Sequence, residues 1–238
     1  MLKKILIIKA GKKLPTLNNV EGDFEDWIIA GMGITDDEAE VISVFEGSRL
    51  PDQHQYKAAV ITGSGAMVTD HDDWIEGTSN WLRSAVASNM PVLGICFGHQ
   101  LLAYALGGEI ADNPAGIEVG TIEASLTEDA NDDILLGGRQ QMMVQASHRQ
   151  CVIGLPDQAV CLAKTAMDQY HAYRIGEHCW GLQFHPEFNA NITRHYIQYY
   201  QVDLQADKRD VGIMLSACDD TAQASECLKS FSKLVELL

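Results

Sequence analysis

The stretch VLGICFGHQ at residues 92–100 decides the fold, because a short run typical of a buried strand passes directly into a cysteine and then into an amphipathic helix. Glycines stand two residues either side of Cys96, at Gly94 and Gly98. Since glycine has no Cβ, the chain can turn sharply there and tolerate a strained residue at the turn. The pattern predicts a nucleophile elbow, in which the helix N-terminus favours the thiolate of Cys96 over the thiol.

A second stretch, GLQFHPE at residues 181–187, supplies the base that a cysteine nucleophile needs. Alternation of apolar and polar residues before it predicts a strand, and Pro186 ends regular structure directly after the histidine. His185 can take a proton, and Glu187 can orient its ring. Nucleophile, base and orienting group in the order Cys, His, Glu form a triad whose members are distant in sequence and expected to be near in space.

Strand-like and helical patterns alternate through the first half of the chain. They cover residues 5–8, 24–32, 41–45, 58–62, 74–87, 92–95 and 97–106, and further strand-like runs follow at 119–126, 142–146, 160–163 and 172–184, before a helix at about 190–202. Alternation of this kind predicts an α/β fold with a mainly parallel sheet flanked by helices, joined to a smaller antiparallel portion. Ligands bind beyond the carboxyl ends of such strands, where Ser64 and Cys96 fall.

The motifs resemble those of the class I, triad-type glutamine amidotransferases, most closely members similar to the amidotransferase domain of GMP synthetase. Two further segments fall in the expected order: ITGSG at 61–65, and ASHR at 146–149 between the elbow and the histidine. The resemblance covers roughly residues 1–200 and implies a three-layer, flavodoxin-like α/β fold. We therefore expect an amidotransferase domain over 1–202 and a C-terminal extension over 203–238, whose amphipathic helix at 222–238 packs on that domain.

The resemblance also implies an enzyme that hydrolyses the side-chain amide of glutamine through a γ-glutamyl thioester on Cys96 and releases ammonia. The backbone amides of Ser64 and Phe97 would form the oxyanion hole. The other residues implied to bind substrate are Gly63, Gly65, Gln100, Ser147, Arg149 and Gln150. Many relatives carry proline at the position of Gly65 and glycine at that of Arg149. We expect a more mobile loop at the first, and at the second a crowded pocket or an added cation for a carboxylate of a larger γ-glutamyl substrate.

Two alternative functions remain open. A γ-glutamyl peptidase would use the same thioester chemistry on γ-glutamyl peptides, and a regulatory or binding protein would keep the site without turnover. The intact Cys96, His185 and Glu187 argue against the second alternative. The chain contains no phosphate loop of the GxxxxGK type, so ATP use in any synthase reaction would belong to a separate acceptor subunit.

Composition limits the remaining partners. The 238 residues hold 33 acidic and 17 basic side chains, and a formal charge of −16 repels nucleic acid and anionic membranes. Six cysteines without disulfide-type spacing favour a reducing, cytoplasmic location. No cofactor and no metal are predicted. His148 and His171 are interpreted as loop or surface histidines, and the acidic run at 70–73 as the cap of a helix that starts near Trp74.

Overall fold

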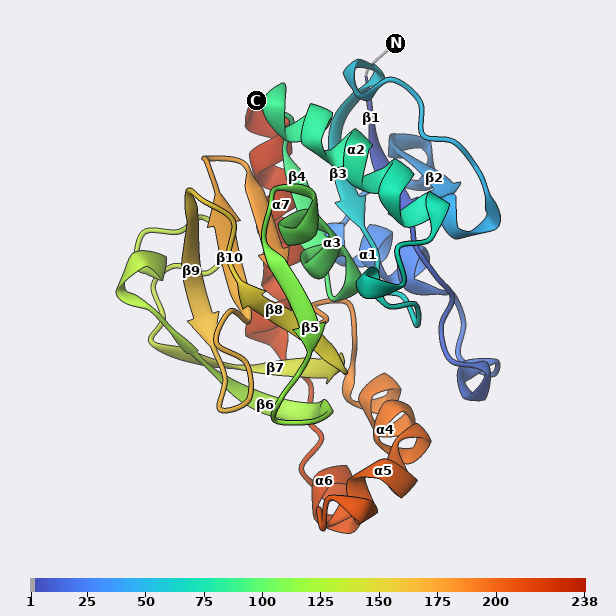
Figure 1. Ribbon diagram of the computed structural model, residues 1–238, viewed down its shortest axis with the longest axis vertical. Helices are drawn as coiled ribbons and strands as arrows, with labels where there is room; N and C mark the ends of the chain where they lie inside the picture. The colour runs from blue at the N-terminus through green and yellow to red at the C-terminus, as the bar shows by residue number, and fades with distance from the viewer. Residues whose placement is uncertain (1–2) are drawn as a thin grey trace.

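Buried strands form a nine-stranded sheet at the centre of the computed structural model, which describes residues 3–238 (Figure 1). The strand order is β2-β1-β3-β4-β11-β10-β9-β6-β7. The parallel part comprises β2 (Ala39–Ser43), β1 (Lys4–Lys9), β3 (Tyr56–Ile61), β4 (Val92–Ile95) and β11 (Cys179–Leu182). The antiparallel part continues with β10 (Ala172–Ile175), β9 (Ala159–Lys164), β6 (Glu118–Leu126) and β7 (Gln141–His148). A separate two-stranded sheet pairs β5 (Glu109–Asp112) with β8 (Gln150–Gly154).

Helices cover both faces of the parallel part and make it the middle of three layers. On one face lie α1 (Phe24–Met32) and α7 (Ala222–Leu237), and on the other α2 (Asp73–Ala87) and α3 (Phe97–Ala105) (Figure 1). Successive strand residues point to opposite faces. In β1, Ile5 and Ile7 join the core beneath α1 and α7, whereas Leu6 and Ile8 join the core beneath α2 and α3.

Three short helices, α4 (Ala190–Tyr199), α5 (Gln201–Ala206) and α6 (Val211–Ser216), follow the last strand and project below the sheet (Figure 1). Tyr196 and Leu204 from this group pack with Phe188 and Val119 in a third apolar cluster. None of the described helices is long and apolar enough to cross a membrane. The chain then returns to the sheet through α7, where the buried Phe231 meets Trp180 edge-on, with ring centroids 6.3 Å apart.

The predicted α/β alternation is confirmed, and the differences are local. The strand predicted at 41–45 ends at Ser43, because Val44 and Phe45 lie in a 3₁₀ turn. The run at 172–184 contains two strands, β10 and β11, which are joined by a turn at Gly176 (φ 59°). The helix predicted at 190–202 ends at Tyr199. β5 and β8 were not predicted, since β5 is short and partly exposed and therefore lacks a hydrophobic pattern.

The elbow is the tightest contact in the parallel part of the sheet. A Cβ at Gly94 would collide with the carbonyl group of Gly98, and a Cβ at Gly98 would lie 2.5 Å from the carbonyl oxygen of Ile61. Both contacts are backbone contacts, so neither can be relieved by a side-chain rotation. The two glycines therefore let α3 begin directly against β3 and β4.

We expect Gly94→Ala and Gly98→Ala to reduce the free energy of unfolding by about 1–3 kcal/mol or more, because the added methyl group overpacks a rigid backbone junction. Gly77→Ala is the matched control. Gly77 lies inside α2 with nothing within 4 Å of its Cβ position, so alanine should be neutral or stabilise by up to about 1 kcal/mol. Denaturant unfolding of the three variants tests this, and equal effects at all three positions would contradict it.

Candidate active site

Cys96 sits between β4 and α3 with φ 52° and ψ −102°, a conformation that is rare for a residue with a Cβ. Cys96 is buried, with 6% of the residue exposed, and its Sγ lies 3.6 Å from the carbonyl oxygen of Ser147. Phe97 is the first residue of α3, so its amide is among the helix donors that have no intrahelical acceptor. The sulfur of Cys96 and an available backbone donor therefore lie together at one helix terminus.

His185 and Glu187 follow β11, the strand next to β4, and the pairing of these strands brings them to Cys96. The amide of Cys96 donates to the carbonyl oxygen of Leu182 at 2.8 Å. His185 is 2% exposed, and its Nδ1 lies 2.7 Å from Oε1 of the buried Glu187 side chain. Phe188 stacks on the imidazole with centroids 3.9 Å apart, which fixes the plane of the ring.

The charges around His185 determine its protonation. Burial by itself lowers the pKa of His185, but the negative charges of Glu187 and Cys96, and hydrogen bonds to both, raise the pKa to about 10. The imidazole therefore keeps its proton at neutral pH and forms an ion pair with its partners. A protonated imidazole of this kind can act as an acid toward a leaving group.

The remaining residues predicted to contact substrate lie around this centre. Gly63 is beside the ring of His185, where an added Cβ would lie 3.0 Å from Cε1. The hydroxyl of Ser64 accepts from the amide of Ala66 at 3.0 Å, and open space surrounds the Cβ position of Gly65. Gln100 is 4% exposed, and its Nε2 donates to Gln183 at 2.9 Å.

Gln150, which follows in the same segment as Ser147, makes hydrogen bonds through both its backbone and its side chain. Nε2 of Gln100 also donates to the carbonyl oxygen of Gln150 at 2.7 Å. The side chain of Gln150 donates to Asp112 at 3.1 Å and to Thr69 at 2.8 Å. All of the predicted site residues thus gather at the carboxyl edge of the parallel strands, except that the side chain of Arg149 points to the exterior.

Comparison with known proteins identifies the family of this chain. The model of the family described as glutamine amidotransferase class-I matches residues 32–202. The chain belongs to that family. Among curated relatives, a GMP synthase (glutamine-hydrolyzing) from Bacteroides thetaiotaomicron is 33% identical over 65% of this chain and 29% of its own length. Gamma-glutamyl peptidase 4 from Arabidopsis thaliana is 27% identical over 80% of this chain and 78% of its own.

Solved structures show the same fold. A glutamine amidotransferase from Methylobacillus flagellatus superposes with a TM-score of 0.80 and 23% identity, covering 100% of this chain and 95% of its own. One from Thermotoga maritima gives a TM-score of 0.76 at 18% identity, with 99% of both chains covered. The predicted three-layer α/β architecture of the class I amidotransferases is therefore confirmed.

Two interpretations of the amidotransferase sequence were wrong. His148 and His171 are not loop or surface histidines, since they are 4% and 0% exposed and contact buried carboxylates. A signal for His148 was present, because the two-residue period of Met142, Val144 and Ala146 continues to it on the inner face of β7. The acidic run at 70–73 precedes α2 as expected, but the side chain at the N-cap, Asp72, makes no capping hydrogen bond.

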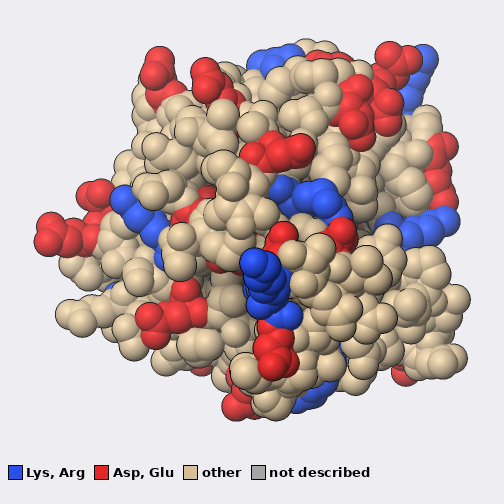
Figure 2. Space-filling model, turned by 60° about the horizontal axis from the view of Figure 1, so that its bottom comes forward, with Lys and Arg blue, Asp and Glu red and all other residues tan. Residues whose placement is uncertain are grey.

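Arg149 of the amidotransferase already has partners. Its guanidinium group lies 3.1 Å from Oδ2 of Asp203 and 5.7 Å from the centroid of the Tyr200 ring. It borders a cavity of about 310 Å³ that is also lined by Asp112 and Asp207. On the face shown in Figure 2, basic side chains lie among acidic ones and do not gather in one patch. Any substrate carboxylate that approaches Arg149 must therefore compete with Asp203.

The raised pKa of His185 predicts how stability depends on pH. Because folding raises this pKa from 6.5 to about 10, the stabilisation is complete below pH 6.5 and is lost as pH rises through about 10. Glu187→Gln removes the charge that contributes most to the rise. We therefore expect wild-type protein to lose more unfolding free energy than Glu187→Gln across that window. Urea unfolding at a series of pH values measures both, and parallel profiles would show that Glu187 does not set the pKa of His185.

Proposed function

We propose that this amidotransferase hydrolyses the side-chain amide of glutamine through a γ-glutamyl thioester on Cys96. One observation carries the proposal: a buried imidazole, held at 2.7 Å by Glu187 and fixed by Phe188, faces a cysteine at a strained helix N-terminus. A buried charged pair is costly unless it is well bonded, and its position next to a nucleophile favours a catalytic role. Family membership supports hydrolysis of a glutamyl amide as the reaction class.

In the proposed mechanism, the Cys96 thiolate attacks the amide carbon and forms the carbon–sulfur bond. The amides of Ser64 and Phe97 are our proposed donors to the oxyanion. His185 gives its proton to the amide nitrogen as the carbon–nitrogen bond breaks, and ammonia leaves. His185 then takes a proton from water, whose oxygen attacks the thioester carbon. The carbon–sulfur bond breaks, glutamate leaves, and the starting thiolate of Cys96 and protonated His185 are restored.

We further propose that a synthase accepts the ammonia. The support is the similarity to a GMP synthase, of which the aligned region makes up 29%. Gly63, Gly65, Gln100, Ser147 and Gln150 are the proposed contacts for the amino-acid end of glutamine. With 33 acidic side chains against 17 basic ones, we propose neither nucleic acid nor membrane as a partner.

A γ-glutamyl peptidase is the second candidate. Its support is the extent of alignment, since gamma-glutamyl peptidase 5 from Arabidopsis thaliana is 26% identical over 93% of this chain and 90% of its own length. Cleavage of a γ-glutamyl peptide needs the same nucleophile, base and oxyanion donors, and only the leaving group differs. The two candidates are therefore separated by substrate and not by triad geometry.

Substitution of the triad residues tests their proposed roles. We expect Cys96→Ala and His185→Ala to lower kcat by on the order of 10⁶-fold. For Glu187→Ala the fall in kcat should be roughly a hundredfold smaller, because an orienting group is worth less than the nucleophile or the base. Cys161→Ala, in the partly exposed β9, is the control and should retain activity. Mass spectrometry should find a γ-glutamyl adduct on Cys96 in the wild type. Near-normal turnover by His185→Ala would remove both His185 and Glu187 from the mechanism.

Steady-state kinetics with glutamine and with γ-glutamyl peptides should separate the two candidates. For the isolated chain we expect slow glutamine hydrolysis, and faster peptide cleavage if Arg149 binds a second carboxylate. Asp203→Asn frees Arg149 from its ion pair, so it should lower KM for such a peptide by about threefold to tenfold and leave KM for glutamine unchanged. Arg149→Ala should instead raise KM for the peptide. High glutamine turnover without peptide cleavage would contradict the role of Arg149.

A further inference from the structure

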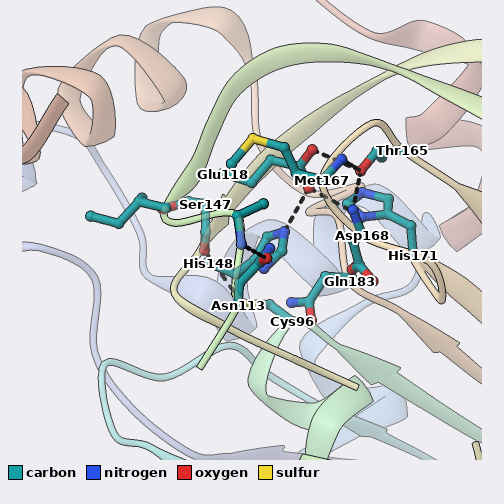
Figure 3. Close-up of polar contacts among 12 residues, drawn as sticks. Cys96, Asn113, Glu118, Ser147, His148, Thr165, Met167, Asp168, His171 and Gln183 are labelled. Carbon is teal, nitrogen blue, oxygen red and sulfur yellow. Dashed lines mark hydrogen bonds and ion pairs between the residues drawn. The ribbon is translucent and has the colours of Figure 1, made fainter. Parts of the chain in front are cut away.

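A cluster of buried ionisable side chains lies behind Cys96. It consists of Glu118, His148, Asp168 and His171, whose side chains are at most 4% exposed (Figure 3). Nε2 of His148 lies 2.9 Å from Oε2 of Glu118, and Nδ1 of His171 lies 3.2 Å from Oδ2 of Asp168. Imidazole and carboxylate groups suit zinc, but tetrahedral ligands about 2.0–2.2 Å from one ion stand roughly 3.4 Å apart. The contacts of 2.9 Å and 3.2 Å are shorter than this spacing, so they are hydrogen bonds between the histidines and the carboxylates.

The two neighbours of His148 determine where its protons are. Nδ1 lies 2.9 Å from the carbonyl oxygen of Gln150, which can only accept, so Nδ1 donates. Nε2 faces the carboxylate of Glu118, so a hydrogen bond there needs a second proton on the ring or one on the carboxylate. Burial raises the pKa of Glu118, but His148, His171 and Thr165 together bring it below its usual value. Both ring nitrogens of His148 are therefore hydrogen-bonded, and Nδ1 is the donor to the carbonyl oxygen of Gln150.

His148 lies at the centre of the turn that faces the nucleophile. Residues 147–150, here called the 147–150 turn, comprise the last two residues of β7, the connecting Arg149 and the first residue of β8. The carbonyl oxygen of Ser147 lies 3.6 Å from Sγ of Cys96, and that of Gln150 accepts from Nε2 of Gln100, one helical turn later. The turn thus contacts α3 through a carbonyl on each side of His148, and Nδ1 of His148 donates to the second of these carbonyls.

Glu118 anchors this arrangement from the neighbouring strand. It faces His148 in the ladder between β6 and β7, and its other oxygen accepts from the hydroxyl of Thr165 at 2.7 Å. His171, at 3.6 Å from the carboxylate of Glu118, stacks on Phe184 beside the proposed base. The carbonyl oxygen of His171 accepts from the amide of Gln183 at 2.9 Å. The cluster is therefore connected to both sides of the triad.

We propose that His148 is a positioning residue, which uses Glu118 as its anchor and its Nδ1–H to hold the 147–150 turn against Cys96 and Gln100. The inference rests on the proposed function, since this turn is the proposed contact for the amino-acid end of the substrate. Because a shift of about 1 Å in a substrate-positioning element can cost a hundredfold in rate, a contact that fixes the turn has a measurable effect. His148 touches no reacting atom.

Two substitutions divide the functions of the ring. In His148→Asn, the side-chain amide nitrogen can replace Nδ1 as donor to the carbonyl oxygen of Gln150, but the hydrogen bond to Glu118 is lost. In His148→Gln, the longer side chain can keep the hydrogen bond to Glu118, but the carbonyl oxygen of Gln150 loses its donor. We expect His148→Asn to keep kcat/KM within about threefold of wild type and His148→Gln to lower it by roughly tenfold to a hundredfold, mainly through KM, because the buried carbonyl oxygen of Gln150 loses its donor. Glu118→Gln, which keeps shape but removes the counter-charge, should fall between them.

A second readout does not depend on the substrate. The rate at which iodoacetamide modifies Cys96, followed by peptide mapping, reports on the contact between Sγ and the carbonyl of Ser147. It should change in His148→Gln and remain near wild type in His148→Asn. His71→Asn and His71→Gln form the control pair, since His71 is exposed at the start of α2 and should alter neither rate. If wild-type protein hydrolyses neither glutamine nor γ-glutamyl peptides, the proposed function fails, and the alkylation rates still test the positioning role.

Three results would overturn the proposal. His148→Gln could match wild type in both kcat/KM and alkylation. His148→Asn and His148→Gln could lose activity equally, in proportion to lower melting temperatures, which would indicate a purely structural role. Purified protein could contain one equivalent of zinc that is absent from His148→Gln, in which case the cluster is a metal centre.

Discussion

The parallel pairing of β4 with β11 is the constraint on which the site depends. Because parallel strands end at the same edge of the sheet, this pairing places two segments more than eighty residues apart in the chain side by side. Gly94 lies opposite Gly181 in the register. A Cβ at Gly181 would strike Tyr173 and His99, just as one at Gly94 would strike α3. Because Gly94 and Gly181 have no side chains, α3 can pack directly against the sheet, and this contact fixes the position of Cys96 at the end of β4.

Charge is buried at two levels around the nucleophile. The pair of His185 and Glu187 is in contact with Cys96, and the pair of His148 and Glu118 lies behind the turn that contacts its sulfur. Removing charged groups from water costs several kcal/mol for each ion. Both carboxylate oxygens of Glu118 accept hydrogen bonds, whereas Oε2 of Glu187 has no partner among the described residues. Phe188 beside His185 and Thr165 beside Glu118 show how each pair is held in place.

The outer boundary of the site is built from the antiparallel part of the sheet and from the helices that follow β11. The ion pair of Arg149 with Asp203 joins the 147–150 turn to α5, and Tyr200 lies beneath the guanidinium group. This boundary is more exposed than the triad, with 44% of the Arg149 side chain accessible, and an exposed pair of this kind is worth little energy. Substitutions at this boundary should therefore leave the buried pairs around Cys96 intact.

The sequence by itself determined the parallel half of the fold and the residues that meet at its edge. The elbow around Cys96 and the segment around His185 are local patterns, readable because glycine spacing, strand periodicity and a following proline each have a direct conformational cause. The tertiary structure decided the rest. The partners of His148 are Glu118, 30 residues away, and the carbonyl of Gln150, and the partner of Arg149 is Asp203, 54 residues away. Such contacts follow from strand register and helix placement, which depend on the packing of the whole chain and leave no pattern within a short window of sequence.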